Sequence, residues 1–153
     1  PRDEKRTKRV GEIFGEGCFL TGQDYSAAAL IFQHGPSIDH NYQSYFWAKK
    51  ALELGDSSRK ELIIDGIDRF LVRQGYKQLF GGITHRIRPQ RCRCLDDVEE
   101  GFADSKRVEM GGKPLAVSMK EITDFNSMIK GCSDVQFCGG LKTPPLGAIP
   151  GVW

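Results

Sequence analysis

The sequence predicts a mainly α-helical fold: a compact bundle of helical hairpins, then a glycine-rich region with one or two short β-hairpins and an extended tail. In the first half, apolar residues recur at helical spacing, between polar capping residues and glycine stops. After Gly75, short alternating stretches separated by glycine pairs replace that pattern. The length of 153 residues fits a single domain, 1–153, with a helical part at about 4–75 and a loop and hairpin part at 76–153.

The second predicted helix has the clearest boundaries. Thr21 with Asp24 three residues later forms a capping-box signal for its start. Gly35 at the C′ position and Pro36 after it are typical of a helix end. Between these signals, residues 27–32 are all apolar, so the helix has apolar groups on every side. We therefore expect it to be buried on every side.

Three further helices are predicted in the first half, at about residues 4–16, 41–54 and 59–74. The last of these carries an apolar stripe made of Ile63, Ile64, Ile67, Phe70 and Leu71. Asp68 lies beside this stripe, and Arg69 points nearly the opposite way. A carboxylate beside a buried stripe needs a partner, because a lone buried charge is costly.

The second half of the sequence predicts less regular structure. Gly81-Gly82 indicates a turn, and Gly111-Gly112 indicates another hairpin. A last helix is predicted to start with a capping box from Ser118 to Glu121. Residues 138–153 are rich in proline and glycine, so we expect an extended tail with its final tryptophan either docked or frayed.

Composition excludes several classes of partner. The chain is 39% hydrophobic and 27% charged with a net charge of +2, which is typical of a soluble globular protein and gives no general case for nucleic acid or membrane binding. No apolar run is long enough to span a bilayer, and the charged start does not resemble a signal peptide. The arginines at 86, 88, 91 and 93 alternate as on a strand, and without aromatic residues between them they suit a bound anion better than specific nucleic acid. The oligomeric state stays open.

The five cysteines are Cys18, Cys92, Cys94, Cys132 and Cys138. Their odd number and irregular spacing argue against a disulfide framework, which favours a reducing compartment and a cytoplasmic location. Their spacing also differs from that of the usual zinc-binding pairs. We therefore expect no metal site and no cofactor.

Three polar residues are candidates for a site. His34 ends a helix that we expect to be buried, so desolvation opposes its charged form while the helix dipole favours it, as suits an acid–base group. Its alternative role is to bond an open carbonyl of its own helix. Asp68 would orient His34, or else form a structural ion pair. Gln78 lies in a glycine-bounded loop, where it would bind substrate or satisfy that loop's own backbone.

Three blocks of the sequence together resemble a family of small uncharacterised bacterial domains. The blocks are "DYSAAALIFQHG", "AKKALELG" and "IDRFLVRQGYKQLFGG", within about residues 7–84. The resemblance implies candidate positions and no chemistry: Gln33, His34, Asp68, Arg69, Gln78 and Gly81. The chain departs from the family pattern at Lys77 and in reading Gly82-Ile83-Thr84 after Gly81. The middle segment is also similar to Sel1-like and tetratricopeptide helix pairs, but a solenoid needs about three repeats and one is visible.

Two functions remain open. In the first, the protein is a small cofactor-independent enzyme that isomerises, cyclises or hydrolyses a small molecule, including an anionic one, by acid–base catalysis. His34 and Asp68 would be catalytic, and the substrate would contact Gln33, Tyr45, Arg69 and Gln78. In the second, it is a non-catalytic helical module that binds a peptide or protein. An enclosed pocket at His34 would favour the enzyme, whereas an open groove lined by Tyr42, Tyr45 and Trp47 would favour the binding module.

Overall fold

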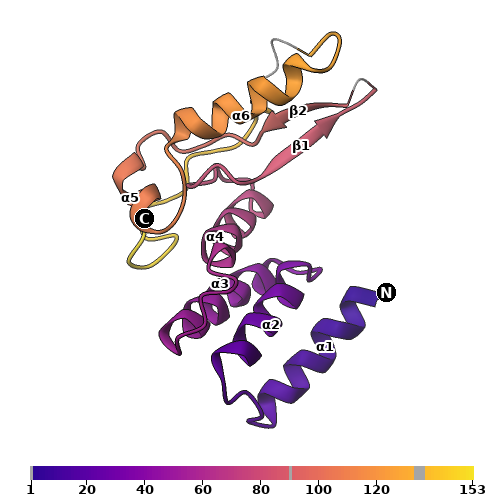
Figure 1. The fold of residues 1–153 in the computed structure, drawn as a ribbon, viewed down its shortest axis with the longest axis vertical. Coiled ribbons are helices and arrows are strands. Elements are labelled where there is room, and N and C mark those ends of the chain that lie inside the picture. The colour runs from indigo at the N-terminus through magenta and orange to yellow at the C-terminus, as the bar shows by residue number, and fades with distance from the viewer. Residues whose placement is uncertain (1, 90, 133–136) are drawn as a thin grey trace. The chain divides into compact units, whose positions relative to one another are not determined.

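A computed structural model describes residues 2–89, 91–132 and 137–153. As predicted, the fold is mainly helical, with six helices and one two-stranded antiparallel sheet in the described residues (Figure 1). The elements are α1 (Arg2–Gly15), α2 (Gly22–Gln33), α3 (Ile38–Glu53), α4 (Glu61–Arg73), β1 (Thr84–Ile87), β2 (Cys92–Leu95), α5 (Asp104–Glu109) and α6 (Leu115–Ser127). None of the described helices combines the length and apolar character needed to cross a membrane.

The chain divides into two compact units that meet inside α4, between Phe70 and Leu71. Unit 1 comprises the residues up to Phe70, and unit 2 comprises Leu71–Trp153. The sequence predicted one domain whose two parts meet near residue 75. The change of pattern after Gly75 therefore marks nearly the same place as the boundary between the units.

Helices α2 and α3 both begin with reciprocal caps. The predicted capping box of α2 is confirmed, because Thr21 Oγ1 accepts the Asp24 N–H at 3.3 Å and the Asp24 carboxylate accepts the Thr21 N–H at 2.8 Å. Helix α3 begins three residues earlier than predicted, with Ser37 as its N-cap. There the Ser37 N–H donates to Nδ1 of His40 at 3.2 Å, so an imidazole replaces the usual carboxylate of the capping box. The sequence placed Asp39 or His40 near the cap, and in the structure His40 takes part in the cap through its imidazole.

Helix α2 is buried along one side, not on every side as predicted. Ala27 is exposed and Leu30 is half-buried, whereas Ala28 and Ala29 are buried. The small alanines allow α3 to pack closely, and Ser44 of α3 donates to the Ala29 carbonyl at 2.8 Å. Helix α1 covers much less of α2 than α3 does. One neighbouring helix along one face leaves the opposite face of α2 open, which a pattern of apolar residues alone cannot reveal.

Two glycines in unit 1 are required by close approaches. Gly35 follows the end of α2 as predicted, but its backbone is not left-handed. A Cβ atom on Gly35 would lie 2.5 Å from the Cβ of His40, so the residue makes room for the capping imidazole. A Cβ atom on Gly66 in α4 would lie 2.8 Å from the backbone nitrogen of Tyr45. Gly66 therefore allows α4 to pack directly on the backbone of α3.

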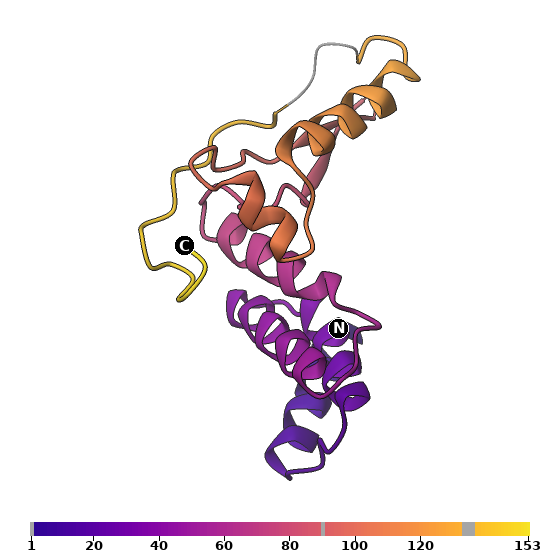
Figure 2. The same cartoon turned by 60° about the vertical axis from the view of Figure 1, so that its left-hand side comes forward.

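Unit 2 is built on a β-hairpin with α6 packed along it (Figures 1 and 2). Strand β1 pairs with β2 in a register that sets His85 opposite Cys94 and Arg86 opposite Arg93. The connection between the strands spans residues 88–91, so the predicted hairpin exists but its turn is not at Gly81-Gly82. The side-chain amide of Asn126 in α6 bonds both the N–H and the carbonyl of Arg93, at 2.8 and 2.7 Å. The core beneath α6 consists of Leu95, Val98, Leu115, Met119 and Ile122.

The hairpin predicted around Gly111-Gly112 is wrong. These glycines connect α5 to α6, and Gly111 adopts φ 91°. The predicted start of α6 at Ser118 is also wrong, because the helix begins at Leu115 after Pro114. The carboxylate of Asp104 accepts the Leu115 N–H at 2.8 Å. A distant side chain thus caps α6, and a local sequence signal cannot predict this.

Two disulfides connect the hairpin to the segment after α6, contrary to the prediction from cysteine spacing. Cys92 pairs with Cys132 and Cys94 with Cys138, while Cys18 is free and exposed. The prediction failed because each bond joins cysteines 40 or 44 residues apart, so the separations within C-x-C and C-x5-C have no bearing on the pairing.

The C-terminal tail is irregular, as predicted, and it is docked. The Cys138 N–H donates to the Leu95 carbonyl at 2.8 Å, which adds a short backbone pairing to β2. The Asp97 carboxylate accepts the N–H groups of Gly139 and Leu141 at 3.1 and 3.0 Å. At the chain end, the indole N–H of Trp153 donates to the Pro144 carbonyl at 3.1 Å. These contacts hold a segment that has no helix or strand of its own.

Candidate functional site

His34 is exposed, not buried as predicted. It is the C-cap residue of α2, where its backbone N–H bonds the last turn of the helix. The expected burial did not occur because α2 is buried along one side only, and the residue that ends it is exposed. A shallow hollow of about 170 Å³ adjoins it, lined by Asp3, Arg6, Leu30, Ile31 and His34. The desolvation argument for an acid–base histidine therefore no longer applies, and its catalytic role stays a prediction.

Gln33 belongs to a polar cluster inside unit 1. Its side-chain amide donates to Oδ2 of Asp65 at 3.1 Å, and its backbone carbonyl accepts the Asn41 amide at 3.0 Å. Burial raises the pKa of the Asp65 carboxyl above its ordinary value, and the charge of Arg69 and the Gln33 hydrogen bond oppose that shift. Gln33 and Asn41 are almost fully buried. We interpret the cluster as the polar centre of the packing between α2, α3 and α4.

Asp68 and Tyr45 are also buried. Asp68 is 1% exposed, and its side chain or backbone interacts with another group. Tyr45 is 4% exposed, and burial raises the pKa of its hydroxyl. His34, Asp68 and Tyr45 belong to unit 1, whereas Gln78 belongs to unit 2. The predicted convergence of His34, Asp68 and Gln78 on one pocket thus stays a prediction.

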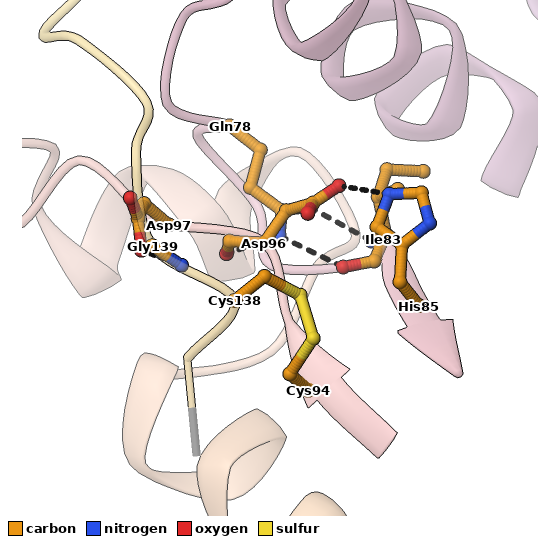
Figure 3. A network of polar contacts seen from close by, with 8 residues as sticks. All are labelled: Gln78, Ile83, His85, Cys94, Asp96, Asp97, Cys138 and Gly139. Atoms are coloured by element: carbon orange, nitrogen blue, oxygen red, sulfur yellow. Dashed lines mark hydrogen bonds and ion pairs between the residues drawn. A yellow bond between two sulfur atoms is a disulfide. The ribbon is translucent and has the colours of Figure 1, made fainter. Parts of the chain in front are cut away.

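The side chain of Gln78 is fully engaged inside unit 2 (Figure 3). Its amide nitrogen donates to the carbonyls of Ile83 and Asp96 at 3.0 and 2.8 Å, and its amide oxygen accepts the Ile83 N–H at 2.8 Å. Gln78 is 0% exposed. Both amide hydrogens are used, so the structure gives this residue the alternative role considered above: it satisfies the backbone of its own loop.

The same network holds a histidine that the sequence left without a role. Nε2 of His85 lies 2.9 Å from Oδ2 of Asp96, and Figure 3 shows the imidazole turned toward that carboxylate. Burial raises the pKa of the Asp96 carboxyl, and the nearby His85 opposes this shift. The His85 side chain is 60% exposed. A carboxylate that orients an exposed imidazole is able to support proton transfer.

Unit 1 has an open groove of about 410 Å³ beside α1 and α3. Its lining consists of Phe14, Tyr25, Phe46, Trp47, Lys49, Lys50 and Glu53. Phe14 and Phe46 are 44% and 45% exposed, although both are large aromatic residues. Trp47 beneath them is 4% exposed and forms ring contacts with Phe14, Phe19 and Phe32 at centroid distances of 5.2, 5.3 and 4.4 Å. The groove therefore has a firmly packed aromatic floor.

The groove expected from the sequence shares only Trp47 with the groove in the structure, because Tyr42 and Tyr45 were expected to line it beside Trp47. Tyr42 instead stacks on Phe70 with ring centroids 4.5 Å apart, and Tyr45 is buried. Phe14 was not found, because nothing in the sequence places α1 against α3. The signal that was available is the adjacent pair Phe46-Trp47, because neighbouring residues on a helix point about 100° apart and a narrow buried face covers only one of them.

Within the described residues, no group of three or more histidine, cysteine or acidic side chains is placed to hold a metal ion. Cys92, Cys94, Cys132 and Cys138 form two disulfides, so none of the four offers a thiolate to a metal ion. Comparison of the chain with protein-family models, with curated proteins and with solved structures found no match in any of the three.

Proposed function

We propose that the protein is a binding protein whose unit 1 takes up a peptide segment in the groove beside α1 and α3. The observation that carries this proposal is that two exposed aromatic rings, Phe14 and Phe46, line the same groove as the buried ring of Trp47. Rigid aromatic side chains dominate the binding energy of many interfaces, because they bury a large area at a small entropic cost. The groove expected to favour a binding module was lined by Tyr42, Tyr45 and Trp47, and this groove shares only Trp47 with it.

The charges at the groove indicate the chemistry of the peptide. Lys50 is paired with Glu53 at 3.5 Å, whereas Lys49 has no acidic partner among the described residues. An acidic side chain on the bound segment would pair with Lys49. We therefore propose an occupant with a large apolar side chain for the aromatic floor and an aspartate or glutamate near it.

The disulfides bear on where such binding takes place. Disulfides form and persist in oxidising environments and are rare in the cytosol. The cytoplasmic location was inferred from the absence of a disulfide framework, and the structure removes that premise. We propose an oxidising compartment instead.

A display library of 15-residue peptides, selected on the oxidised chain, tests the proposed binding. We expect the enriched peptides to share a large apolar residue close to an acidic one. Phe46→Ala and Lys49→Glu should each weaken the binding of a selected peptide about tenfold or more, which is the usual effect of truncating an interface anchor. Leu52→Ala is the matched control, because Leu52 is an exposed apolar residue of α3 that does not line the groove. Equal binding by wild type and Phe46→Ala would refute the proposal.

A further inference from the structure

The hairpin of unit 2 carries an accumulation of positive charge that the proposed groove does not use. Residues 84–95 contain four arginines and no acidic residue, and residues 125–132 contain Lys130 and no acidic residue. The disulfide between Cys92 and Cys132 holds these two segments together. Figure 1 shows the hairpin turn and the C-terminal end of α6 at the same end of the unit. We call this surface, made of Arg86, Arg88, Arg91, Arg93 and Lys130, the basic tip.

The cations of the basic tip are not neutralised within the described parts of the chain. No ion pair joins any of the five to an acidic residue there, although pairs such as Arg107–Asp104 and Lys120–Asp124 occur elsewhere in the unit. Among the described acids nearest in sequence, Asp96 contacts His85, Asp97 accepts two backbone N–H groups and Asp124 pairs with Lys120, while Asp134 lies outside the described residues. Within the described residues, the positive charge of the tip is therefore open to an external anion.

Two features place cations at the tip at a cost to the fold. The register sets Arg86 directly opposite Arg93, and like charges in that position destabilise a strand pair. Arg91 adopts φ 65°, a left-handed conformation that glycine or asparagine takes at lower cost. An anion bound between the guanidinium groups would relieve the first of these costs.

The geometry of the tip is preorganised. Cζ of Arg93 lies 4.1 Å from the centre of the Phe125 ring, while Asn126 fixes the Arg93 backbone. Arg86 lies in β1, and Arg88 lies just beyond the end of that strand. Several guanidinium groups spread over the hairpin match a polymer with repeated anionic groups better than they match one small anion. Guanidinium groups also bind the oxygens of sulfate and phosphate esters in a bidentate manner.

We propose that the basic tip binds an acidic polysaccharide bearing sulfate esters. Nucleic acid is disfavoured, because the aromatic ring at the tip, Phe125, lies under Arg93 and is not offered for base stacking. The disulfides that build the tip also favour an oxidising compartment, such as the outside of the cell. This site is in unit 2 and is independent of the groove in unit 1.

Isothermal titration of the oxidised chain with a heparin octasaccharide tests this proposal. We expect binding whose affinity falls with salt at a log–log slope of about 3, which corresponds to four or five contacted charges at about 0.7 each. The double variant Arg86→Gln/Arg88→Gln should weaken the binding at least tenfold. The control Lys5→Gln/Lys8→Gln removes the same charge from exposed positions of α1 and should bind like the wild type.

Two comparison ligands separate the alternatives: a single-stranded DNA oligonucleotide of equal charge, and vesicles containing phosphatidylserine. The proposal requires both to bind more weakly than the octasaccharide. Equal or tighter binding of DNA would make the tip a nucleic-acid site, and equal or tighter binding of vesicles would make it a membrane-surface site; either result overturns the proposal. Equal loss of affinity in the Lys5/Lys8 control would show that only net charge matters, and no binding at low salt would refute the site outright.

Discussion

Nε2 of His85 lies 2.9 Å from Oδ2 of Asp96, so an imidazole that is 60% exposed is attached to a carboxylate whose side chain is 7% exposed. The contact joins β1 to the residue directly after β2. The side-chain amide of Gln78 also donates a hydrogen bond to the backbone carbonyl of Asp96. The pair therefore links an exposed imidazole to the hydrogen-bonded backbone at the base of the hairpin.

The stability of unit 2 should contain a component that depends on the ionisation of Asp96. Burial raises the pKa of this carboxyl in the folded state, so its contribution is fully present below the unfolded value and is lost as pH rises through the folded value. In Asp96→Asn this component should be absent, and the stability curve should be flatter just above pH 3.8. Urea unfolding between pH 3 and 7, followed by Trp153 fluorescence in a Trp47→Phe background, measures it. Identical pH curves for the two proteins would contradict the prediction.

Removal of the disulfide between Cys92 and Cys132 should destabilise unit 2 strongly. The bond closes a sequence separation of 40 residues, for which the chain-entropy estimate is about 4 kcal/mol of unfolding free energy. Denaturant unfolding of Cys92→Ser/Cys132→Ser tests this expectation. Cys18→Ser is the control, because this exposed free thiol should contribute little. A double variant as stable as the wild type would show that the bond does not stabilise the unit.

Loss of the α2 cap should destabilise unit 1. Thr21→Ala removes one half of the capping box and should lower the unfolding free energy by about 1 kcal/mol. Trp47 fluorescence in a Trp153→Phe background reports the unfolding of this unit. Thr123→Ala in α6 serves as a control, because this exposed hydroxyl only bonds a carbonyl within its own helix and belongs to the other unit. A shift of Trp47 unfolding by the control as large as that by Thr21→Ala would refute a role for the cap.

Two helical glycines should respond in opposite ways to alanine. A Cβ atom at Gly66 would meet the backbone of α3 at 2.8 Å, so Gly66→Ala should destabilise unit 1 by roughly 1–3 kcal/mol. A Cβ atom at Gly11 in α1 would meet nothing within 4 Å, so Gly11→Ala should stabilise the helix by about 0.5–1 kcal/mol. Thermal unfolding distinguishes the two variants. A destabilising effect of Gly11→Ala would show that α1 packs more tightly than the structure has it.

The exposed position of His34 gives a sharp test of its predicted acid–base role. Because its side chain lies on the open side of the end of α2, His34→Gln should leave the stability of unit 1 nearly unchanged. The same variant should also bind groove peptides like the wild type, since His34 does not line the groove. If a stably folded His34→Gln variant lost peptide binding, His34 would take part in the binding site.

The sequence by itself determined the helical class of the protein, the helices of unit 1 and the cap at Thr21, because these features depend on periodicity and on residues a few positions apart. It also indicated the change of structure near residue 75. Several of its errors share one physical cause: they concerned contacts between residues distant in the chain. Asp104 decides where α6 begins, α3 decides which side of α2 is buried, and cysteines 40 residues apart form a disulfide.

The candidate sites show the same division. The arginines at alternating positions were visible in the sequence, but only the register that sets Arg86 opposite Arg93, and the Phe125 ring under Arg93, make them a surface. The sequence indicated Trp47 as a groove residue. Phe14 could not be identified from the sequence, because its contact with Trp47 depends on the packing of α1. Residue type fixes which chemistry is available, while the tertiary structure decides which side chains meet and which remain exposed, because both depend on packing between elements that no local pattern encodes.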